Sequence, residues 1–177
     1  MQHPRDIARK STPSLRTPTA EDGPAIWELV RSCKPLDENS IYCNLLQCDH
    51  FADTCVVAEL DGEVVGWISG YLTPNAGDTL FVWQVAVSEK ARGMGLGVTM
   101  LQSLLNREIC AGVTRLQTTI TADNAASWGM FRKFARVQGG TLSSEPHFLK
   151  SEHFKGRAST ENMVTIDLDS DAMERAA

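Results

Sequence analysis

The sequence predicts one α/β (α+β) domain, with a mixed central β-sheet flanked by helices. Two helical patterns come first, and three β-type segments joined by short turns follow them. A strand–helix–strand pattern then spans residues 80–121, which places two neighbouring strands parallel. A further helix and a last strand complete the chain. Since 177 residues suit one domain, we expect it over 16–168, between a flexible leader (1–15) and a charged tail (169–177).

The first two elements are expected to be helices because apolar residues recur at helical spacing behind a start signal. Thr19 and Asp22 form a capping box, so the first helix is expected over 20–33, ending before Pro35. A shorter helix is expected over 39–48. Its core residues are expected to be Leu45 and Leu46.

Three strands follow, and their apolar patterns differ. Residues 54–60 and 64–72 are rich in β-branched side chains, and Asp61-Gly62 between them is typical of a tight hairpin turn. Residues 80–87 are almost continuously apolar, which indicates a central strand covered on both faces. Gln84 interrupts this run, so its amide needs a hydrogen-bond partner if it is buried.

The second half alternates helix and strand after a glycine-rich turn. A glycine pair, Gly139-Gly140, ends the last helix. A helix is expected to begin near Val98 and to close at Gly112, and a strand is expected at 116–121. Asp123 and Asn124 are expected to cap the last helix, whose core face holds Ser127, Met130, Phe131 and Phe134. An irregular stretch at 141–161 and a strand at 163–168 are expected to follow.

The charge and hydropathy of the chain exclude some classes of function. Seventeen Lys and Arg against 22 Asp and Glu give a net charge of −5, the opposite of the basic surface that general nucleic-acid binding needs. No apolar run approaches the roughly 18 residues of a membrane helix. The N-terminus also lacks the apolar region of a secretory signal. We therefore expect neither a nucleic-acid nor a membrane partner.

The five cysteines are an odd number, and no secretory signal accompanies them. This combination predicts reduced thiols and a cytoplasmic protein. Cys43, Cys48, His50 and Cys55 lie close in sequence, yet they lack the paired spacing of known zinc motifs. No metal is expected.

The glycine-rich turn joins the buried strand to an amphipathic helix, and this is a favourable place to bind an anion. Free N–H groups and the positive end of the helix dipole meet there, and Arg92 adds a cation. Gly93, Gly95 and Gly97 let a ligand approach the backbone, although the same glycines could simply form a turn. Both common nucleotide motifs fail, because no Lys follows the glycines and Val98 stands where a dinucleotide loop needs glycine.

The turn resembles the pyrophosphate loop of the GCN5-related N-acetyltransferases, R/Q-x-x-G-x-G/A, with Arg92, Gly95 and Gly97 in place. The resemblance implies that the loop, including Gly93, holds the pyrophosphate of acetyl-CoA. It implies further that the strand backbone at Val85 and Val87 pairs with the pantetheine arm, to which Asn124 also bonds. Phe131 completes the implied cofactor set. It stands where many of these enzymes have the Tyr that protonates the leaving thiolate, and it cannot donate a proton.

Longer segments resemble the L-2,4-diaminobutyrate acetyltransferases, namely 37–48, 54–58, 66–71, 78–87 and 116–121. This resemblance implies acetyl transfer from acetyl-CoA to the γ-amine of L-2,4-diaminobutyrate. That reaction gives N(γ)-acetyl-L-2,4-diaminobutyrate, in the biosynthesis of ectoine, a compatible solute for osmoadaptation. It also implies a homodimer. The family often has His-Asp-Thr-Glu where this chain has Ala158-Ser-Thr-Glu161.

Acidic and aromatic residues are the candidates for binding the diamine. Asp37 is expected to anchor an amine, although Asp37 or Asn39 could instead cap the next helix. Tyr42 and Trp83 are further candidates for substrate binding, with packing in the core as the alternative for both rings.

The base is sought in the irregular stretch. Glu152 and His153 are the candidate catalytic residues, and Glu152 is also a candidate for amine binding. An exposed polar loop is the alternative, and Glu145 and His147 are weaker candidates. Arg132 or Lys133 could contact the CoA 3′-phosphate, or both could lie on a solvated helix face.

The expected mechanism is direct transfer in a ternary complex, because no His or Asp is placed reliably beside Cys48 or Cys55 to support an acetyl-cysteine intermediate. Two other functions stay open at this stage. One is acetylation of another small amine, such as a polyamine or ornithine. The other is a non-catalytic acyl-CoA-binding module, which the absence of the Tyr at Phe131 favours.

Overall fold

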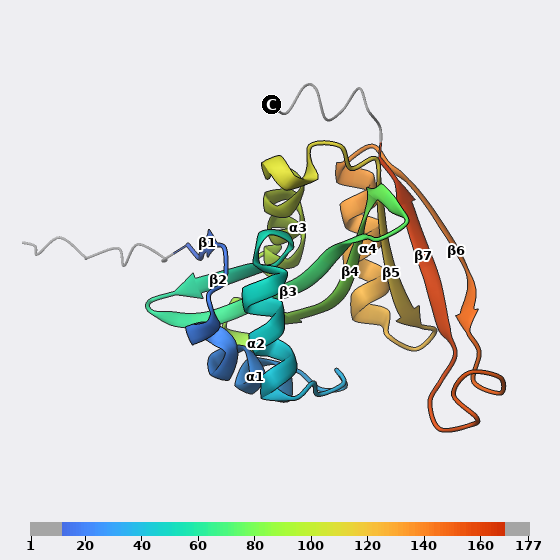
Figure 1. Cartoon of the computed structure of the whole chain (residues 1–177), viewed down its shortest axis with the longest axis horizontal. Helices are drawn as coiled ribbons and strands as arrows, with labels where there is room; N and C mark the ends of the chain where they lie inside the picture. Colours follow the sequence, from blue (N-terminus) through green and yellow to red (C-terminus); the bar gives the residue numbers. More distant parts are fainter. Residues whose placement is uncertain (1–11, 169–177) are drawn as a thin grey trace, which may run out of the picture.

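A computed structural model describes residues 12–168 (Figure 1). The elements, in order, are β1 (Ser14–Arg16), η1 (Ala20–Asp22), α1 (Gly23–Ser32), α2 (Ile41–His50), η2 (Ala52–Thr54), β2 (Val56–Leu60), β3 (Glu63–Thr73), β4 (Ala76–Val87), η3 (Glu89–Ala91), α3 (Leu96–Leu105), η4 (Glu108–Cys110), β5 (Arg115–Thr121), α4 (Ala125–Val137), β6 (Thr141–Phe148) and β7 (Glu161–Asp167). The predicted mixed sheet flanked by helices is confirmed.

The seven strands form one sheet in the order β1-β2-β3-β4-β5-β7-β6. Among the described strands, only β4 and β5 are parallel, and α3 connects them, as the strand–helix–strand pattern predicts. The other neighbouring pairs are antiparallel. In Figure 1, α1 and α2 cover one face of the sheet, and α3 and α4 cover the other.

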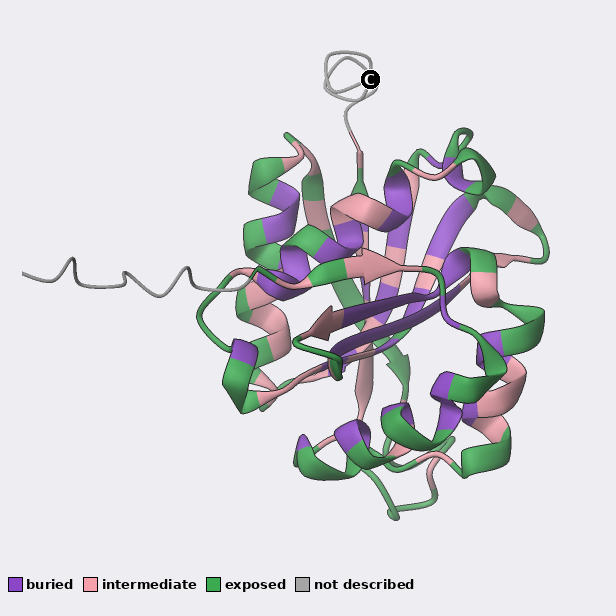
Figure 2. Ribbon diagram, turned by 90° about the vertical axis from the view of Figure 1, so that its left-hand side faces the viewer, coloured by how far each residue is buried: buried purple, intermediate pink, exposed green. Residues whose placement is uncertain are grey.

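Each face of the sheet has its own apolar core. The larger core packs sheet residues such as Ile68 and Leu116 against α3 and α4. The smaller core joins α1, through Ile26 and Val30, to Trp67 on β3. Figure 2 shows the buried positions on the central strands and on the inward sides of the helices. The central sheet is therefore packed on both faces.

The sheet opens between β4 and β5. Their parallel pairing covers only Thr79–Phe81 against Arg115–Gln117, and β5 then pairs with β7 alone. A bulge on β4 lies just beyond, because Gly70 pairs with Val82 and Ser69 with Gln84, which leaves Trp83 unpaired. The second half of β4 therefore keeps one backbone edge free of a neighbouring strand.

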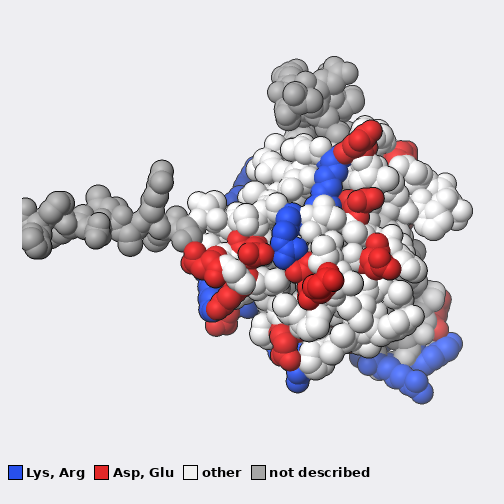
Figure 3. All heavy atoms as spheres, turned by 60° about the vertical axis from the view of Figure 1, so that its left-hand side comes forward, with Lys and Arg blue, Asp and Glu red and all other residues white. Residues whose placement is uncertain are grey.

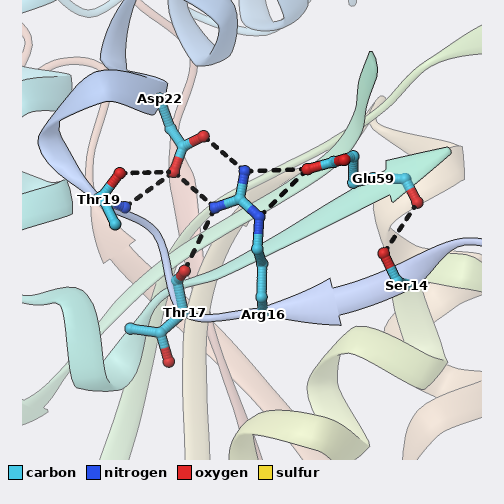
Figure 4. Close-up of polar contacts among 6 residues, drawn as sticks. All are labelled: Ser14, Arg16, Thr17, Thr19, Asp22 and Glu59. Carbon is cyan, nitrogen blue, oxygen red and sulfur yellow. Dashed lines mark hydrogen bonds and ion pairs between the residues drawn. The ribbon is translucent and has the colours of Figure 1, made fainter. Parts of the chain in front are cut away.

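Arg16 on β1 ties the start of the domain to the sheet (Figure 4). Its two Nη atoms donate to the two carboxylate oxygens of Asp22, each at 2.7 Å, and Nη2 also donates to Glu59 Oε2 at 3.1 Å. The Arg16 guanidinium lowers the pKa of Asp22, although burial acts in the opposite direction. Such a bidentate pair is both directional and strong.

Several local predictions are confirmed. Asp61 and Gly62 adopt φ values of 51° and 81°, as the hairpin requires. Thr19 and Asp22 form the capping box, and the Thr19 N–H donates to Asp22 Oδ2 at 2.8 Å. Gln84 is buried and is hydrogen-bonded to the loop before α2.

The second half differs from prediction at two places. Residues 141–148 are not irregular but form strand β6, because β7 supplies their pairing partner. Seven of these eight residues are exposed, so no apolar alternation marks the strand in the sequence. The third helix ends at Leu105 instead of continuing toward Gly112, and the short helix η4 follows it.

The first part of the chain also differs. Leu45 and Leu46 are only half-buried, because α2 turns Asn44, Gln47 and Cys48 inward. Ser14 and Leu15, assigned to the leader, belong to β1 and pair with β2. The remainder of the predicted leader up to residue 11, and the tail at 169–177, lie outside the described residues.

Charged side chains are dispersed over the face drawn in Figure 3, with acidic and basic groups interspersed and no continuous basic band. Within residues 12–168, no helix has the length and apolarity needed to cross a bilayer.

Candidate active site

A cavity of about 640 Å³ lies where β4 and β5 separate. Four parts of the chain line it, and together they bring the implied cofactor residues to one place. They are the end of β4 (Val85, Val87), the glycine loop (Arg92, Gly93, Gly95, Gly97), the start and middle of α4 (Asn124, Met130, Lys133) and the segment Cys33–Leu36.

The glycine loop forms the floor of this cavity at the N-terminus of α3. Gly95 is the N-cap and adopts φ 72°, a left-handed conformation that side chains with a Cβ rarely tolerate. The first-turn N–H groups that follow it have no acceptor within the helix, and they carry the positive end of the helix dipole. The loop is thereby suited to phosphate oxygens.

Gly97 serves a different purpose, since it lets α3 and α4 approach closely. A Cβ at this position would lie 2.4 Å from Met130 Sδ, well inside van der Waals contact. The absence of a side chain brings α4 close enough for Met130 and Lys133 to line the cavity. A ligand between the helices therefore meets both.

Cations stand on two sides of the loop. Arg92 is exposed and pairs with Glu89 at 3.1 Å. Lys133 reaches from α4, and its Nζ lies 3.8 Å from the position that a Cβ of Gly95 would occupy. Two positive side chains and one helix N-terminus thus surround the same small volume.

Asn124 opens α4 at the rim of the cavity. Its Oδ1 accepts from the Ser127 N–H at 3.1 Å, so the residue is the N-cap, as predicted. The indole of Trp128 donates to the Thr121 carbonyl at 3.1 Å and fixes the end of β5 against α4. With Oδ1 occupied, the Asn124 Nδ2 group is the part left to bind a ligand.

One acceptor candidate, Asp37, lies beside the cavity. Asp37 is exposed and directly follows the lining residue Leu36. It does not cap α2, and neither does Asn39, because the Ser40 hydroxyl accepts from the Cys43 N–H. Instead, the Gln84 amide donates to the Asp37 carbonyl at 2.8 Å.

Both aromatic candidates are accessible. Trp83, at the bulge of β4, is 50% exposed, and Tyr42 on α2 is 68% exposed. Neither ring is therefore a core residue. Neither belongs to the cavity lining itself, although Trp83 lies two residues before the lining residue Val85.

Glu161, at the start of β7, is a carboxylate that the sequence analysis did not select. It is half-buried and pairs across the sheet with Thr121. Burial raises its pKa above the ordinary value, the Thr119 hydroxyl opposes this rise, and the charges of Asp37 and Asp123 add to it. The charges of two carboxylates from two other segments therefore act on Glu161.

Comparison with known proteins identifies the family. The acetyltransferase (GNAT) family model matches residues 23–135. L-2,4-diaminobutyric acid acetyltransferase from Methylotuvimicrobium alcaliphilum is 46% identical over 86% of this chain and 89% of its own length. The enzyme of the same name from Vibrio cholerae is 45% identical over 96% of this chain and 99% of its own.

The chain belongs to the L-2,4-diaminobutyric acid acetyltransferases of the GNAT family. Among solved structures, diaminobutyrate acetyltransferase EctA from Paenibacillus lautus, in complex with L-2,4-diaminobutyric acid and coenzyme A, superposes with a TM-score of 0.85. It is 36% identical and covers 89% of this chain and 96% of its own. The resemblance predicted from the sequence is confirmed.

Not every predicted residue of this diaminobutyrate acetyltransferase site lies at the cavity. Phe131 is 2% exposed and belongs to the larger core, outside the cavity lining. Glu152 and His153 are exposed in the loop between β6 and β7, which projects away from the domain in Figure 1. The Leu149 N–H donates to His153 Nδ1 at 2.8 Å, so one ring nitrogen is already occupied.

One signal could have pointed to Glu161. It ends the short stretch that stands where the family often has His-Asp-Thr-Glu, so it aligns with the acidic member of that motif. The composition of β7 did not single out Glu161, because the strand also contains Asn162, Thr165 and Asp167.

Cys48 and Cys55 of this family member are poor nucleophiles. All five are free thiols. Burial raises the pKa of Cys48 and of Cys55 to about 12 each, so both thiols are neutral near pH 7. Among the described residues, no group of three or more His, Cys, Asp or Glu side chains is arranged to hold a metal ion.

Proposed function

We propose that this chain transfers the acetyl group of acetyl-CoA to the γ-amine of L-2,4-diaminobutyrate, the acetylation step of ectoine biosynthesis. One observation carries the proposal. A cationic, glycine-lined cavity adjoins a set of carboxylates, because Asp37 follows the lining residue Leu36 and Asp123 precedes the lining residue Asn124. Anionic phosphates suit the first part and an acceptor with two ammonium groups suits the second.

The cavity residues fit acetyl-CoA, which supplies the acetyl thioester. At Gly95 only Lys133 Nζ lies within 4 Å of the position that a Cβ would occupy, which leaves the loop backbone open to a pyrophosphate. Arg92 and Lys133 supply the counter-charge. The free edge of β4 at Val85 and Val87 offers backbone groups to the amides of the pantetheine arm, and Asn124 Nδ2 adds a donor.

Glu161 is the proposed general base. The attacking amine must be neutral, and an alkyl ammonium has a pKa of about 10.4, so a side chain has to accept its proton. A raised pKa makes the Glu161 carboxylate a stronger base than an exposed glutamate. The neutral amine nitrogen then attacks the thioester carbonyl directly, and a carbon–nitrogen bond forms as the carbon–sulfur bond breaks. CoA leaves as the thiolate and takes up the second proton that the nitrogen loses, which gives the amide and free CoA thiol. Neutral Cys48 and Cys55 disfavour an acetyl-cysteine route, which supports a ternary complex.

We also propose that the enzyme is a homodimer built through β6. This strand lies at the edge of the sheet, and seven of its eight residues are exposed. An exposed edge strand is a template for pairing with another chain. Phe148 at its end is 42% exposed and contacts the rings of His147, His153 and Phe154 edge-on.

The free thiols support a reducing, cytoplasmic location.

The proposed function is tested by CoA thiol release from acetyl-CoA with L-2,4-diaminobutyrate, ornithine, lysine, spermidine or no amine. NMR of the product locates the acetyl group. We expect strong selectivity for diaminobutyrate and acetylation at the γ-nitrogen. Preferred turnover of another amine overturns the substrate assignment, and CoA binding without any turnover indicates a binding module.

A further inference from the structure

Gln84 is a polar residue in an apolar strand, and it connects the two halves of the site. It lies on β4 between Trp83 and the cavity residue Val85, and it is 8% exposed. Its Nε2 donates to the Asp37 carbonyl at 2.8 Å, and its Oε1 accepts from Asn39 Nδ2 at 3.4 Å. Both ends of the amide thus bind the loop that carries Asp37.

The amide of Gln84 has no competing partner within the sheet. Ser69 is its pairing partner on β3, but the Ser69 hydroxyl is buried and makes no hydrogen bond within the described chain. A buried amide is costly to leave unpaired, so the loop is held to β4 as long as Gln84 is present. The same segment also contacts the sheet through Leu36, which packs on the smaller core, and through Cys33 Sγ, which donates to the Val87 carbonyl at 3.4 Å. Among the described hydrogen bonds, however, only the one from Gln84 is made to Asp37 itself.

We propose that Gln84 is a positioning residue, which holds the Asp37 carboxylate at a fixed place relative to the β4 edge that binds the acetyl donor. This inference rests on the proposed function. Correct orientation of an amine toward a thioester depends on small displacements, because reactive geometry requires close approach. The bulge at Trp83 sets where along β4 this connection is made.

The test compares Gln84→Met with wild-type enzyme by steady-state kinetics. Methionine keeps the length and removes both hydrogen bonds. We expect the KM for diaminobutyrate to rise about fivefold to tenfold, and the KM for acetyl-CoA to stay within about twofold. In an Asp37→Asn background, the same change should add less than about twofold, because the two residues act in one chain of contacts.

Two further variants keep the test sharp if Gln84→Met folds poorly. Asn39→Leu removes the second bond from the loop side, where packing is loose, and should raise only the KM for diaminobutyrate, by about threefold. Gln117→Leu is the matched control, since Gln117 Nε2 donates to Thr165 Oγ1 at 3.1 Å elsewhere in the sheet. It should leave both KM values unchanged.

The inference is overturned if either folded variant leaves the KM for diaminobutyrate unchanged, or if Gln84→Met has its full effect without the Asp37 carboxylate. The proposed function fails in a different way, through a wild-type enzyme that does not acetylate diaminobutyrate.

Discussion

The two halves of the site are built differently. The cofactor half comes largely from one continuous stretch, from Val85 through Gly97, where a strand, a glycine loop and a helix follow one another. The acceptor half takes Asp37, Asp123 and Glu161 from three segments that the chain brings together only in the folded sheet. A local motif can encode the first, whereas the second depends on strand pairing over long sequence separations.

The largest effect is expected in the acceptor half. Glu161→Gln keeps the size of the side chain and removes the proposed base, so kcat should fall by about 10² to 10⁴. The KM for acetyl-CoA should change little. Glu108→Gln, at an exposed carboxylate on η4, is the control and should keep wild-type activity. Equal loss in the two variants would contradict the assignment.

The pH dependence of kcat/KM is a second test of the acceptor half and of its proposed base. Glu161 must be ionised to accept a proton, and burial, Asp37 and Asp123 raise its pKa. The acid limb of kcat/KM should therefore lie above pH 4.5, the ordinary value for this group, with activity lost as the pH falls through the raised pKa. The profile is measured with diaminobutyrate below its KM. If the residual activity of Glu161→Gln kept the same acid limb in its kcat/KM profile, the titrating group would be another residue.

A smaller effect is expected in the cofactor half. Gly95→Val forces a β-branched residue to φ 72° and strains the loop, so the Kd for CoA should rise about tenfold. Isothermal titration calorimetry with CoA measures it. Gly77→Ala is the control, because its φ is ordinary and nothing lies within 4 Å of its Cβ position. If Gly95→Val bound CoA normally, the glycine loop would not be the phosphate site.

The smallest effect on the site is expected from removing the Arg16–Asp22 ion pair, which lies away from both halves of the site. Arg16→Met removes the guanidinium of Figure 4 and should lower the free energy of unfolding by about 1–2 kcal/mol, with CoA affinity unchanged. Urea denaturation measures this loss. A changed CoA affinity at unchanged stability would contradict this separation.

The stabilisation by Arg16 should also depend on pH. The folded-state pKa of Asp22 is depressed, so the stabilisation is complete above its unfolded-state value of about 3.8 and is lost as the pH falls through the lower folded-state value. Wild type and Arg16→Met should therefore converge in stability in strong acid.

Local patterns in the sequence determined much of this protein. Some features depend only on the φ angles and hydrogen bonds of neighbouring residues, so their residue types predict them. These are the hairpin at Asp61-Gly62, the capping box at Thr19 and the glycine loop. In the same way, the apolar run of β4 predicts a central strand. Family resemblance added the chemistry of the cofactor half and the identity of the acceptor.

Only the tertiary structure decided the rest. β6 has no apolar alternation, and it is a strand because β7 pairs with it. Glu161 joins Asp37 because the order β4-β5-β7 brings its strand to the opening of the sheet, although more than a hundred residues separate the two carboxylates. Gln84 was recognisable as a residue in need of a partner, but its partner was not. Hydrogen bonds between distant segments produce no periodic pattern in the sequence, because each partner looks locally like any other polar residue. Sequence patterns therefore cannot predict which two residues will meet.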